Sequence, residues 1–197
     1  MIVCHKLKLG RCIMKLTSCL AGVLLALGSA SSYSVFADSH SQAGYYRAPT
    51  LHNNQLIFTA EGDLWTQNLS QNHASRLTSL PNEEIDASIS QDGKWVAYLA
   101  DYDGTKEVYV MPVNGGVGKR VTFENSRVRL QGWTSKGDIL YSTDNAHGPS
   151  NYWVLRTVNP QTLTTTDLPL ADAVEGVIDT KGDYVYFTRF GLQTTGD

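Results

Sequence analysis

Short apolar runs alternate with turn signals along the chain from about residue 46 to its last residue. Runs rich in β-branched and aromatic residues, which favour strands, occur at 87–90, 95–100, 107–113 and 119–123. Asp-Gly and Asn-Gly pairs separate these runs, and such pairs favour the tight turns of antiparallel hairpins. No run after residue 37 has the 3.6-residue period of an amphipathic helix. The pattern therefore predicts an all-β chain.

The strand pattern repeats along the chain. The segments SQDGKWVAY, SKGDILYS and TKGDYVYF each join a hydroxyl residue, a glycine-containing turn and an apolar run, and HNNQLIFT is a degenerate fourth copy. Their strands begin at Leu56, Trp95, Ile139 and Tyr184, which are 39, 44 and 45 residues apart. Four short antiparallel strands in a unit of this length are typical of a blade of a β-propeller.

Two further landmarks recur at an interval of 44 residues. Arg76-Leu77-Thr78 is matched by Arg120-Val121-Thr122, and an apolar-aromatic pair ends at Trp65, Tyr109 and Trp153. Packing between blades must repeat at the blade period, whereas a ligand-stacking box gains nothing from an identical interval. We therefore expect all three aromatic residues to pack between blades.

The repeats predict blades at residues 46–83, 84–127, 128–172 and 173–197, the last one incomplete. Only 160 residues follow Ala37, whereas four complete blades of this period need roughly 176 and known propellers have about four to eight blades. We therefore expect about three and a half four-stranded blades of a truncated ring that continues in a longer polypeptide. The alternative is that several short arcs assemble into one ring.

Residues 1–37 have the layout of a secretory signal peptide. Lys15 precedes an apolar stretch from Leu16 to Leu27, and small residues lead to Ala37, where we expect cleavage. The stretch is shorter than the ~20 residues that cross a bilayer, so no stable membrane anchor is expected. The mature chain is then periplasmic or secreted, with a short linker at 38–45. Met14 is an alternative start, and a buried N-terminal helix is the alternative to a leader.

Composition excludes several classes of function. The chain is 42% hydrophobic and 18% charged, which argues against both a disordered polymer and a polytopic membrane protein. All three cysteines lie within the first 19 residues, so the repeats hold no disulfide, cysteine metal site or thiol nucleophile. All 19 acidic residues follow residue 37, and this acidic balance argues against nucleic-acid binding.

Motifs for catalysis and cofactor binding are missing from the sequence. There is no GxSxG or HExxH, and the five histidines show no paired spacing. Gly115 to Arg120 lacks the residues of a phosphate loop and is interpreted as a hairpin turn, while Asp101, Asp103 and Glu107 fit an EF-hand poorly. Glu124, Arg127 and Arg129 lie in the link between the second and third blades, near the expected central channel, without forming a recognisable site. We expect no catalytic, cofactor-binding or metal residues.

The repeat from Ile85 to Phe123 resembles those of TolB-like propellers, which also occur in the prolyl oligopeptidase and tricorn families. The opening of the chain is similar to the start of the first propeller of bacterial tricorn-like proteases, and so are the third repeat and the ending Tyr186-Phe187-Thr188-Arg189-Phe190-Gly191. The residues of the opening that carry this similarity are Ala48-Pro49, Leu56-Ile57-Phe58, Asp63-Leu64-Trp65 and Arg76-Leu77-Thr78. The resemblance covers residues 45–197, and the order of the whole set favours tricorn over TolB.

The tricorn resemblance implies a larger protein. Proteases of that family carry two propellers, a PDZ domain and a serine-protease core, and their propellers are thought to admit unfolded peptides and release products. We therefore expect this chain to be an inactive propeller segment of a secreted serine-type endopeptidase. Its expected partners are unfolded peptides or a protein, the remaining propeller and protease domains, and further copies through the full-length protein. The alternatives are a TolB-like protein-binding propeller without enzymatic activity and the propeller cap of a prolyl oligopeptidase-like enzyme.

Overall fold

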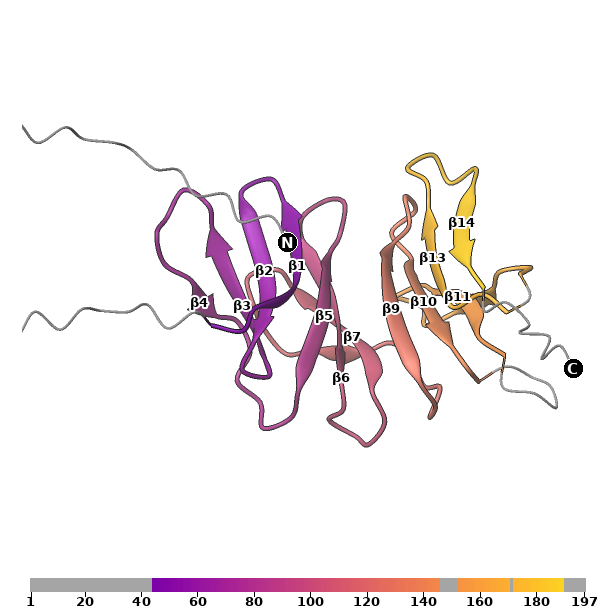
Figure 1. Ribbon diagram of the computed structural model, residues 1–197, viewed down its shortest axis with the longest axis horizontal. Helices are drawn as coiled ribbons and strands as arrows, with labels where there is room; N and C mark the ends of the chain where they lie inside the picture. The colour runs from indigo at the N-terminus through magenta and orange to yellow at the C-terminus, as the bar shows by residue number, and fades with distance from the viewer. Residues whose placement is uncertain (1–43, 146–151, 171, 190–197) are drawn as a thin grey trace, which may run out of the picture. The chain divides into compact units, whose positions relative to one another are not determined.

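The computed structural model describes residues 44–145, 152–170 and 172–189. The predicted signal peptide, the alternative start at Met14 and most of the 38–45 linker lie outside these residues. All regular structure in the described residues is antiparallel β-sheet, which confirms the all-β prediction (Figure 1). In the part of the chain that the structure describes, no helix is long and apolar enough to span a membrane.

The strands form three four-stranded sheets and one hairpin, each paired in chain order. The first sheet contains β1 (Arg47–His52), β2 (Gln55–Ala60), β3 (Asp63–Asn68) and β4 (Ser75–Arg76). The second contains β5 (Glu84–Ile89), β6 (Trp95–Ala100), β7 (Glu107–Pro112) and β8 (Lys119–Arg120). The third contains β9 (Val128–Trp133), β10 (Ile139–Thr143), β11 (Val154–Val158) and β12 (Thr165–Asp167), and the hairpin is β13 (Glu175–Ile178) with β14 (Val185–Thr188).

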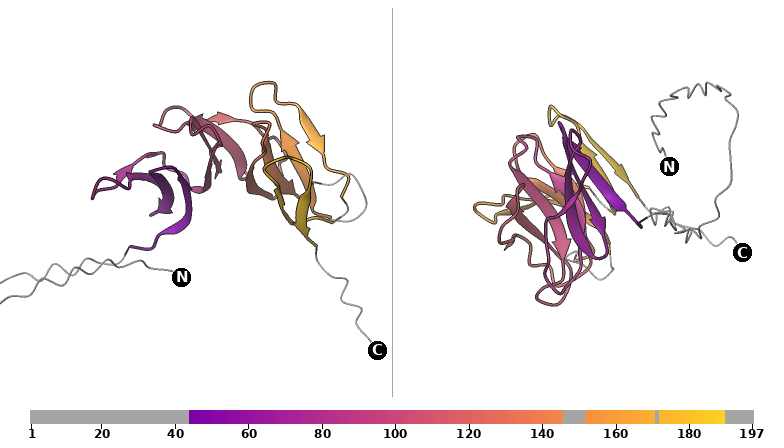
Figure 2. Two further views of the ribbon diagram at one scale, coloured as in Figure 1. Left: turned by 90° about the horizontal axis from the view of Figure 1, so that it is seen from above. Right: turned by 90° about the vertical axis from the view of Figure 1, so that its left-hand side faces the viewer.

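Neighbouring sheets approach each other through their first strands. β1 contacts β5, β5 contacts β9, and β9 contacts β13, as in a propeller, whose first strands line the central axis. β13 contacts β9 and β10, and Val185 of β14 packs on the core of the third sheet. Figure 2 shows the first and last described sheets at opposite ends of the set. The described residues therefore form three and a half blades of an unclosed ring, as the repeats predict.

The hydrophobic core lies between the sheets. Alternate residues of a strand point to opposite faces, so a central blade supplies one face to each neighbour. The second sheet contributes Val96, Tyr98 and Met111 to the cluster shared with the first sheet, and Leu99, Val108 and Val121 to the cluster shared with the third. A smaller cluster joins the third sheet to the hairpin through Leu140, Leu155, Ala173, Ile178 and Val185.

The register corrects one part of the repeat. Leu77 N–H donates to Leu64 O, Val121 N–H to Val108 O and Leu168 N–H to Leu155 O, so Leu155 is the third equivalent residue. The interval is thus 44 and then 47 residues, because the β10–β11 connection is longer than its counterpart in the second sheet.

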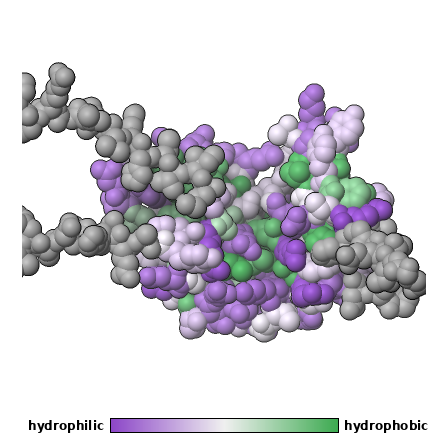
Figure 3. Space-filling model, viewed as in Figure 1, coloured by the Kyte–Doolittle hydropathy of each residue, from purple (hydrophilic) through white to green (hydrophobic). Residues whose placement is uncertain are grey.

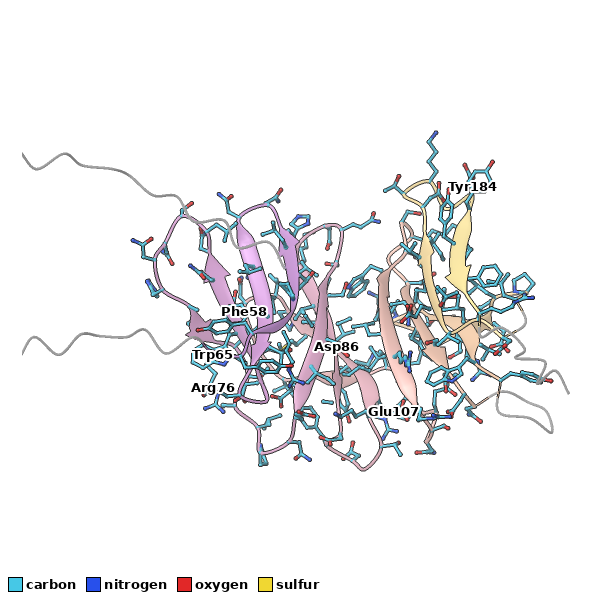
Figure 4. The ribbon with its side chains drawn as sticks, viewed as in Figure 1. Phe58, Trp65, Arg76, Asp86, Glu107 and Tyr184 are labelled. Carbon is cyan, nitrogen blue, oxygen red and sulfur yellow. The ribbon has the colours of Figure 1, made fainter. Side chains whose placement is uncertain are left out.

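The predicted equivalence of Trp153 to Trp65 and Tyr109 is therefore wrong. Arg156 occupies the equivalent place in the third sheet, and Trp153 lies just before β11. Tyr109 is buried between the first and second sheets. Trp65 lies on the face of the first sheet that points away from the second, near Phe58, so only Tyr109 fulfils the prediction directly (Figure 4).

Candidate functional site

The first strands are bulged, and the bulges decide which side chains face the central axis. Ile85 pairs with Leu99 and Ser88 with Ala97, so two residues of β5 oppose one residue of β6. A matching irregularity follows Arg47 in β1, and β9 is irregular opposite Leu140 and Tyr141. Such bulges bend a strand and redirect a side chain.

Asp86 lies at the bulge of β5. Its φ of 54° is left-handed, a conformation that Asp tolerates better than most residues. Its side chain is exposed and makes no ion pair or hydrogen bond among the described residues. Figure 4 shows it halfway along the strand, on the side that also carries β9.

Arg129 occupies β9, next to Asp86 along the series of first strands. Its Nη1 lies 3.9 Å from Glu175 Oε1 on β13, and both side chains are at least half-exposed. The guanidinium also lies 4.7 Å from the ring centre of Trp153, which is buried. The Trp153 ring therefore holds one face of the Arg129 guanidinium by a cation–π contact, and the exposed edge of the guanidinium is left available to a ligand.

These three charged residues border one hollow of about 650 Å³ on the side of the first strands. Gln131 of β9 links the third sheet to the hairpin at this hollow. Its Oε1 accepts a hydrogen bond from Gly176 N–H on β13 at 3.0 Å, and its Nε2 donates to Ser142 on β10. Figure 3 shows that the surrounding face is mixed, with hydrophilic residues around apolar patches. We call the set Asp86, Arg129 and Glu175 the inner wall.

Arg127, next but one to Arg129, has a structural partner. Its Nε donates to Asp144 Oδ2 at 2.6 Å, and its guanidinium lies 5.3 Å from the Trp153 ring. Burial alone would raise the pKa of Asp144, but hydrogen bonds from Ser126 and Arg127 outweigh it and hold the pKa below its usual range. This pair closes the end of the third sheet.

Glu124 belongs to the link between the second and third blades. It accepts hydrogen bonds from Tyr141 Oη at 2.6 Å, Arg156 Nη1 at 2.7 Å and Asn145 Nδ2 at 2.9 Å. Its side chain is nearly buried, so it anchors the link instead of facing the channel. Of the three link residues singled out from the sequence, only Arg129 lies at the inner wall.

The repeated Arg-x-Thr triplets also have a structural role. Thr78 Oγ1 accepts a hydrogen bond from Leu64 N–H at 2.9 Å, and Thr122 Oγ1 accepts one from Val108 N–H at 2.8 Å. The preceding arginines pair with buried carboxylates: Arg76 with Asp63, and Arg120 with Glu107. The triplets thus fix the fourth strand to the third in the first and second blades.

Buried acids elsewhere are committed to the fold. Glu107 is fully buried and accepts hydrogen bonds from Thr122 Oγ1, Asn125 N–H and Arg120, so it is not free to bind calcium with Asp103. Among the described residues, no group of three or more His, Cys, Asp or Glu side chains is placed to hold a metal ion. Gly115 N–H donates to Pro112 O in the turn between β7 and β8, as the hairpin interpretation expects.

Glu84 is a buried carboxyl at the join of the first and second blades. Burial raises its pKa, as does the neighbouring carboxylate of Asp63, against the hydrogen bonds that it accepts from Tyr102 and Thr78. Tyr102 Oη donates to Glu84 Oε1 at 2.7 Å. The side chain is fully buried at the join and therefore has no access to a ligand.

The sequence prediction missed Asp86 and Glu175. Neither lies in a recognisable motif, and their common feature is position on a first strand. The Ala48-Pro49 and Asp86-Ala87 pairs occupy matching bulges, and this correspondence is a signal that could have identified Asp86. His5, His40 and His147 lie outside the described residues.

Comparison with known proteins places the chain in a family. The model of the tricorn protease N-terminal β-propeller domain matches residues 43–196. Tricorn protease homolog 1 of Streptomyces coelicolor is 39% identical over 97 residues, which cover 49% of this chain and 9% of that protein. A protein of Sulfurisphaera tokodaii described as a Tricorn-like protease N-terminal subunit is 35% identical over 115 residues, covering 56% of this chain and 57% of that protein. The chain therefore spans less than two thirds of the length of these relatives.

Solved structures show the same fold at low sequence identity. The tricorn protease gives a TM-score of 0.62 at 20% identity, covering 69% of this chain and 14% of that one. TolB from Acinetobacter baumannii gives 0.63 at 15% identity, covering 77% and 39%. Since these identities support the fold alone, the family assignment rests on the family model and on the curated relatives. The chain belongs to the tricorn protease N-terminal β-propeller domain family.

Proposed function

We propose that this chain is the leading propeller segment of a secreted tricorn-like serine protease and that its inner wall receives unfolded peptides. The observation that carries the proposal is the row of exposed charges on three successive first strands. Asp86, Arg129 and Glu175 border one hollow, and the single ion pair among them is as long as 3.9 Å. Such weakly engaged charges remain available to a passing chain.

The proposed chemistry is binding and passage, without cleavage. Alternating acidic and basic groups can pair with charged side chains of many sequences, and Gln131 and the exposed aromatic Tyr186 beside them offer polar and apolar contacts. Exposed pairs of this kind are individually weak, which suits a surface that must release each peptide. The catalytic core would belong to another part of the protein, and this segment alone would hydrolyse nothing.

Binding of an unfolded polypeptide to the full chain tests the proposal. Fluorescence anisotropy with fluorescein-labelled, reduced and carboxymethylated protein should show binding that weakens with salt, because screening reduces exposed charge pairs. Arg129→Gln and Asp86→Asn should each weaken it by about two- to fivefold, the range for a lost exposed charge contact.

Asp183→Asn is the matched control, since Asp183 is an exposed acid in the β13–β14 turn. This variant should bind like the wild type. Binding that is unaffected by both inner-wall substitutions, or affected equally by the control, would contradict the proposal. A tight, salt-insensitive complex with one folded protein would instead favour a TolB-like binding module.

A further inference from the structure

A second hollow of about 470 Å³ lies between the second and third blades, away from the inner wall. Its main lining residues come from β6, β8, β9 and the β9–β10 and β11–β12 turns: Trp95, Lys119, Trp133, Lys136, Pro160 and Gln161. It shares none of its lining residues with the inner-wall hollow. We call it the interblade groove.

Two tryptophans form the apolar part of the groove. Trp133 is held in place, because its Nε1 donates to Ser88 O on the neighbouring blade at 2.9 Å. Trp95 is 41% exposed, and its indole N–H has no partner among the described residues. A partly exposed indole whose N–H has no hydrogen-bond partner offers a ligand both an apolar face and a hydrogen-bond donor.

Blade architecture does not require these tryptophans. The register places Gln55 of the first sheet, Asp138 of the third and Tyr184 of the hairpin at the position of Trp95, and Ile89 of the second sheet at that of Trp133. Polar side chains therefore serve the position of Trp95 in the first and third sheets, and a smaller one serves that of Trp133 in the second. Tyr184 is likewise an exposed aromatic residue, and Trp95 differs from it in bordering a hollow together with Trp133.

The charges of the groove are unbalanced. Asp92 is engaged locally: it accepts hydrogen bonds from Ser90 Oγ at 2.6 Å and Lys94 N–H at 3.1 Å, and the first of these is the main cause of its lowered pKa. Lys119 Nζ has a neutral partner, the carbonyl of Pro160 at 3.1 Å, and exposed Lys136 has no partner among the described residues. Two ammonium groups thus lack a carboxylate in a chain whose net charge is -3.

We propose that the interblade groove binds the C-terminal end of a peptide. The apolar last side chain lies against Trp95 and Trp133, and the terminal carboxylate is met by Lys136 and Lys119. The side-chain amides of Gln91 and Gln161 also line the groove without partners among the described residues, and each can both donate to and accept from a peptide group. The volume suits one or two residues, within the usual range of ligand sites.

A labelled peptide tests the proposal on the full chain. The probe is fluorescein-Gly-Ala-Gly-Ala-Phe with a free carboxylate, compared by anisotropy with the same peptide as its C-terminal amide. The carboxylate should bind at least tenfold more tightly, the factor for one charge-assisted hydrogen bond. Equal binding of the two peptides, or no binding of either, would overturn the proposal.

Matched lysines separate the groove from general charge. Lys136 lies in Ser135-Lys136-Gly137 and Lys181 in Thr180-Lys181-Gly182, the corresponding turn of the next repeat. Lys136→Gln should weaken binding of the free carboxylate about tenfold and leave the amide unchanged, whereas Lys181→Gln should change neither. An equal effect of the two substitutions would contradict the groove as the site.

Trp95→Gln tests the apolar part of the groove. Glutamine is compatible with this strand position, because Gln55 occupies it in the first sheet. The substitution should weaken binding of the probe severalfold while the far-ultraviolet circular dichroism and melting temperature stay unchanged. Asp86→Asn should leave probe binding intact, so failure at the inner wall and failure at the groove are distinguishable. N-acetylphenylalanine, which carries both the apolar side chain and the terminal carboxylate, should compete with the probe, and N-acetylphenylalanine amide should compete at least tenfold more weakly. Equal competition by the two compounds would contradict recognition of the carboxylate by the groove.

Discussion

Arg156→Met is the substitution that most directly probes how the second and third blades are joined. Arg156 is only 5% exposed, with Nη1 at 2.7 Å from Glu124 Oε2 and Nε at 2.6 Å from Asp167 Oδ1. Its pKa is raised, because although burial alone would lower it, the two carboxylates outweigh the burial. Methionine keeps much of the side-chain volume and removes the charge.

The expected loss follows from the partner that remains. Glu124 is nearly buried, so removal of the arginine leaves a carboxylate with only Tyr141 and Asn145 as side-chain donors. Breaking a buried pair in this way costs about 3–5 kcal/mol. Each kcal/mol lowers the melting temperature of a chain of this size by about 2–4 °C.

Arg127→Met is the matched control. Its ion pair with Asp144 has the same 2.6 Å distance, but the Arg127 side chain is 68% exposed, and in the variant Asp144 keeps the hydrogen bonds from Ser126 Oγ and from the backbone N–H of residue 127. We expect a loss of about 1 kcal/mol or less, as for surface ion pairs. Urea unfolding of the full chain at pH 7, followed by circular dichroism and fluorescence, measures both variants. Adding Glu124→Gln to Arg156→Met should restore part of the stability.

The reasoning is refuted if Arg156→Met and Arg127→Met lower the free energy of unfolding equally. An unchanged Arg156→Met protein would show that the link between the blades depends on its apolar contacts alone.

Three further predictions concern other parts of the chain. Burial raises the pKa of Glu84, so its favourable contribution to the free energy of unfolding is complete below the usual carboxyl pKa of 4.5 and is lost as the pH rises through the folded-state pKa. The stability of Glu84→Gln relative to wild type should therefore increase from pH 4.5 to 7 in urea unfolding. A decrease would contradict this prediction. Gly118→Ala should cost about 1–3 kcal/mol, because the new Cβ would collide with the Tyr98 hydroxyl, and Tyr98→Phe should recover part of this loss in the same assay. Export of the full-length precursor in a Gram-negative host should yield a mature chain beginning at Asp38, and N-terminal sequencing that finds an uncleaved leader would count against the signal peptide.

Turn chemistry carried most of the fold prediction. Asp-Gly and Asn-Gly pairs and strand-forming runs are local signals, and they predicted the hairpins because each acts within a few residues. The Arg-x-Thr repeat was found for the same reason, since its contacts join adjacent strands of one blade. The third aromatic landmark failed because the β10–β11 connection is longer, and a fixed interval cannot detect a change in connection length.

The candidate site was less accessible to sequence reasoning. Arg129 was noticed because links lead into the first strand of the next blade. Asp86 and Glu175 become part of one surface only when three first strands lie side by side and a bulge turns the Asp86 side chain toward the hollow of the inner wall. Such long-range placement depends on packing between sheets that no single segment encodes.

Photo-crosslinking of an unfolded peptide to the full chain is the most direct test of peptide passage along the inner wall. A carboxymethylated peptide with a benzophenone at its centre would be irradiated with the protein, and the attached residues identified by mass spectrometry. We predict crosslinks on β5, β9 and β13 that diminish in Arg129→Gln. Crosslinks confined to the outer strands β4, β8 and β12, or equal in the variant, would contradict the account.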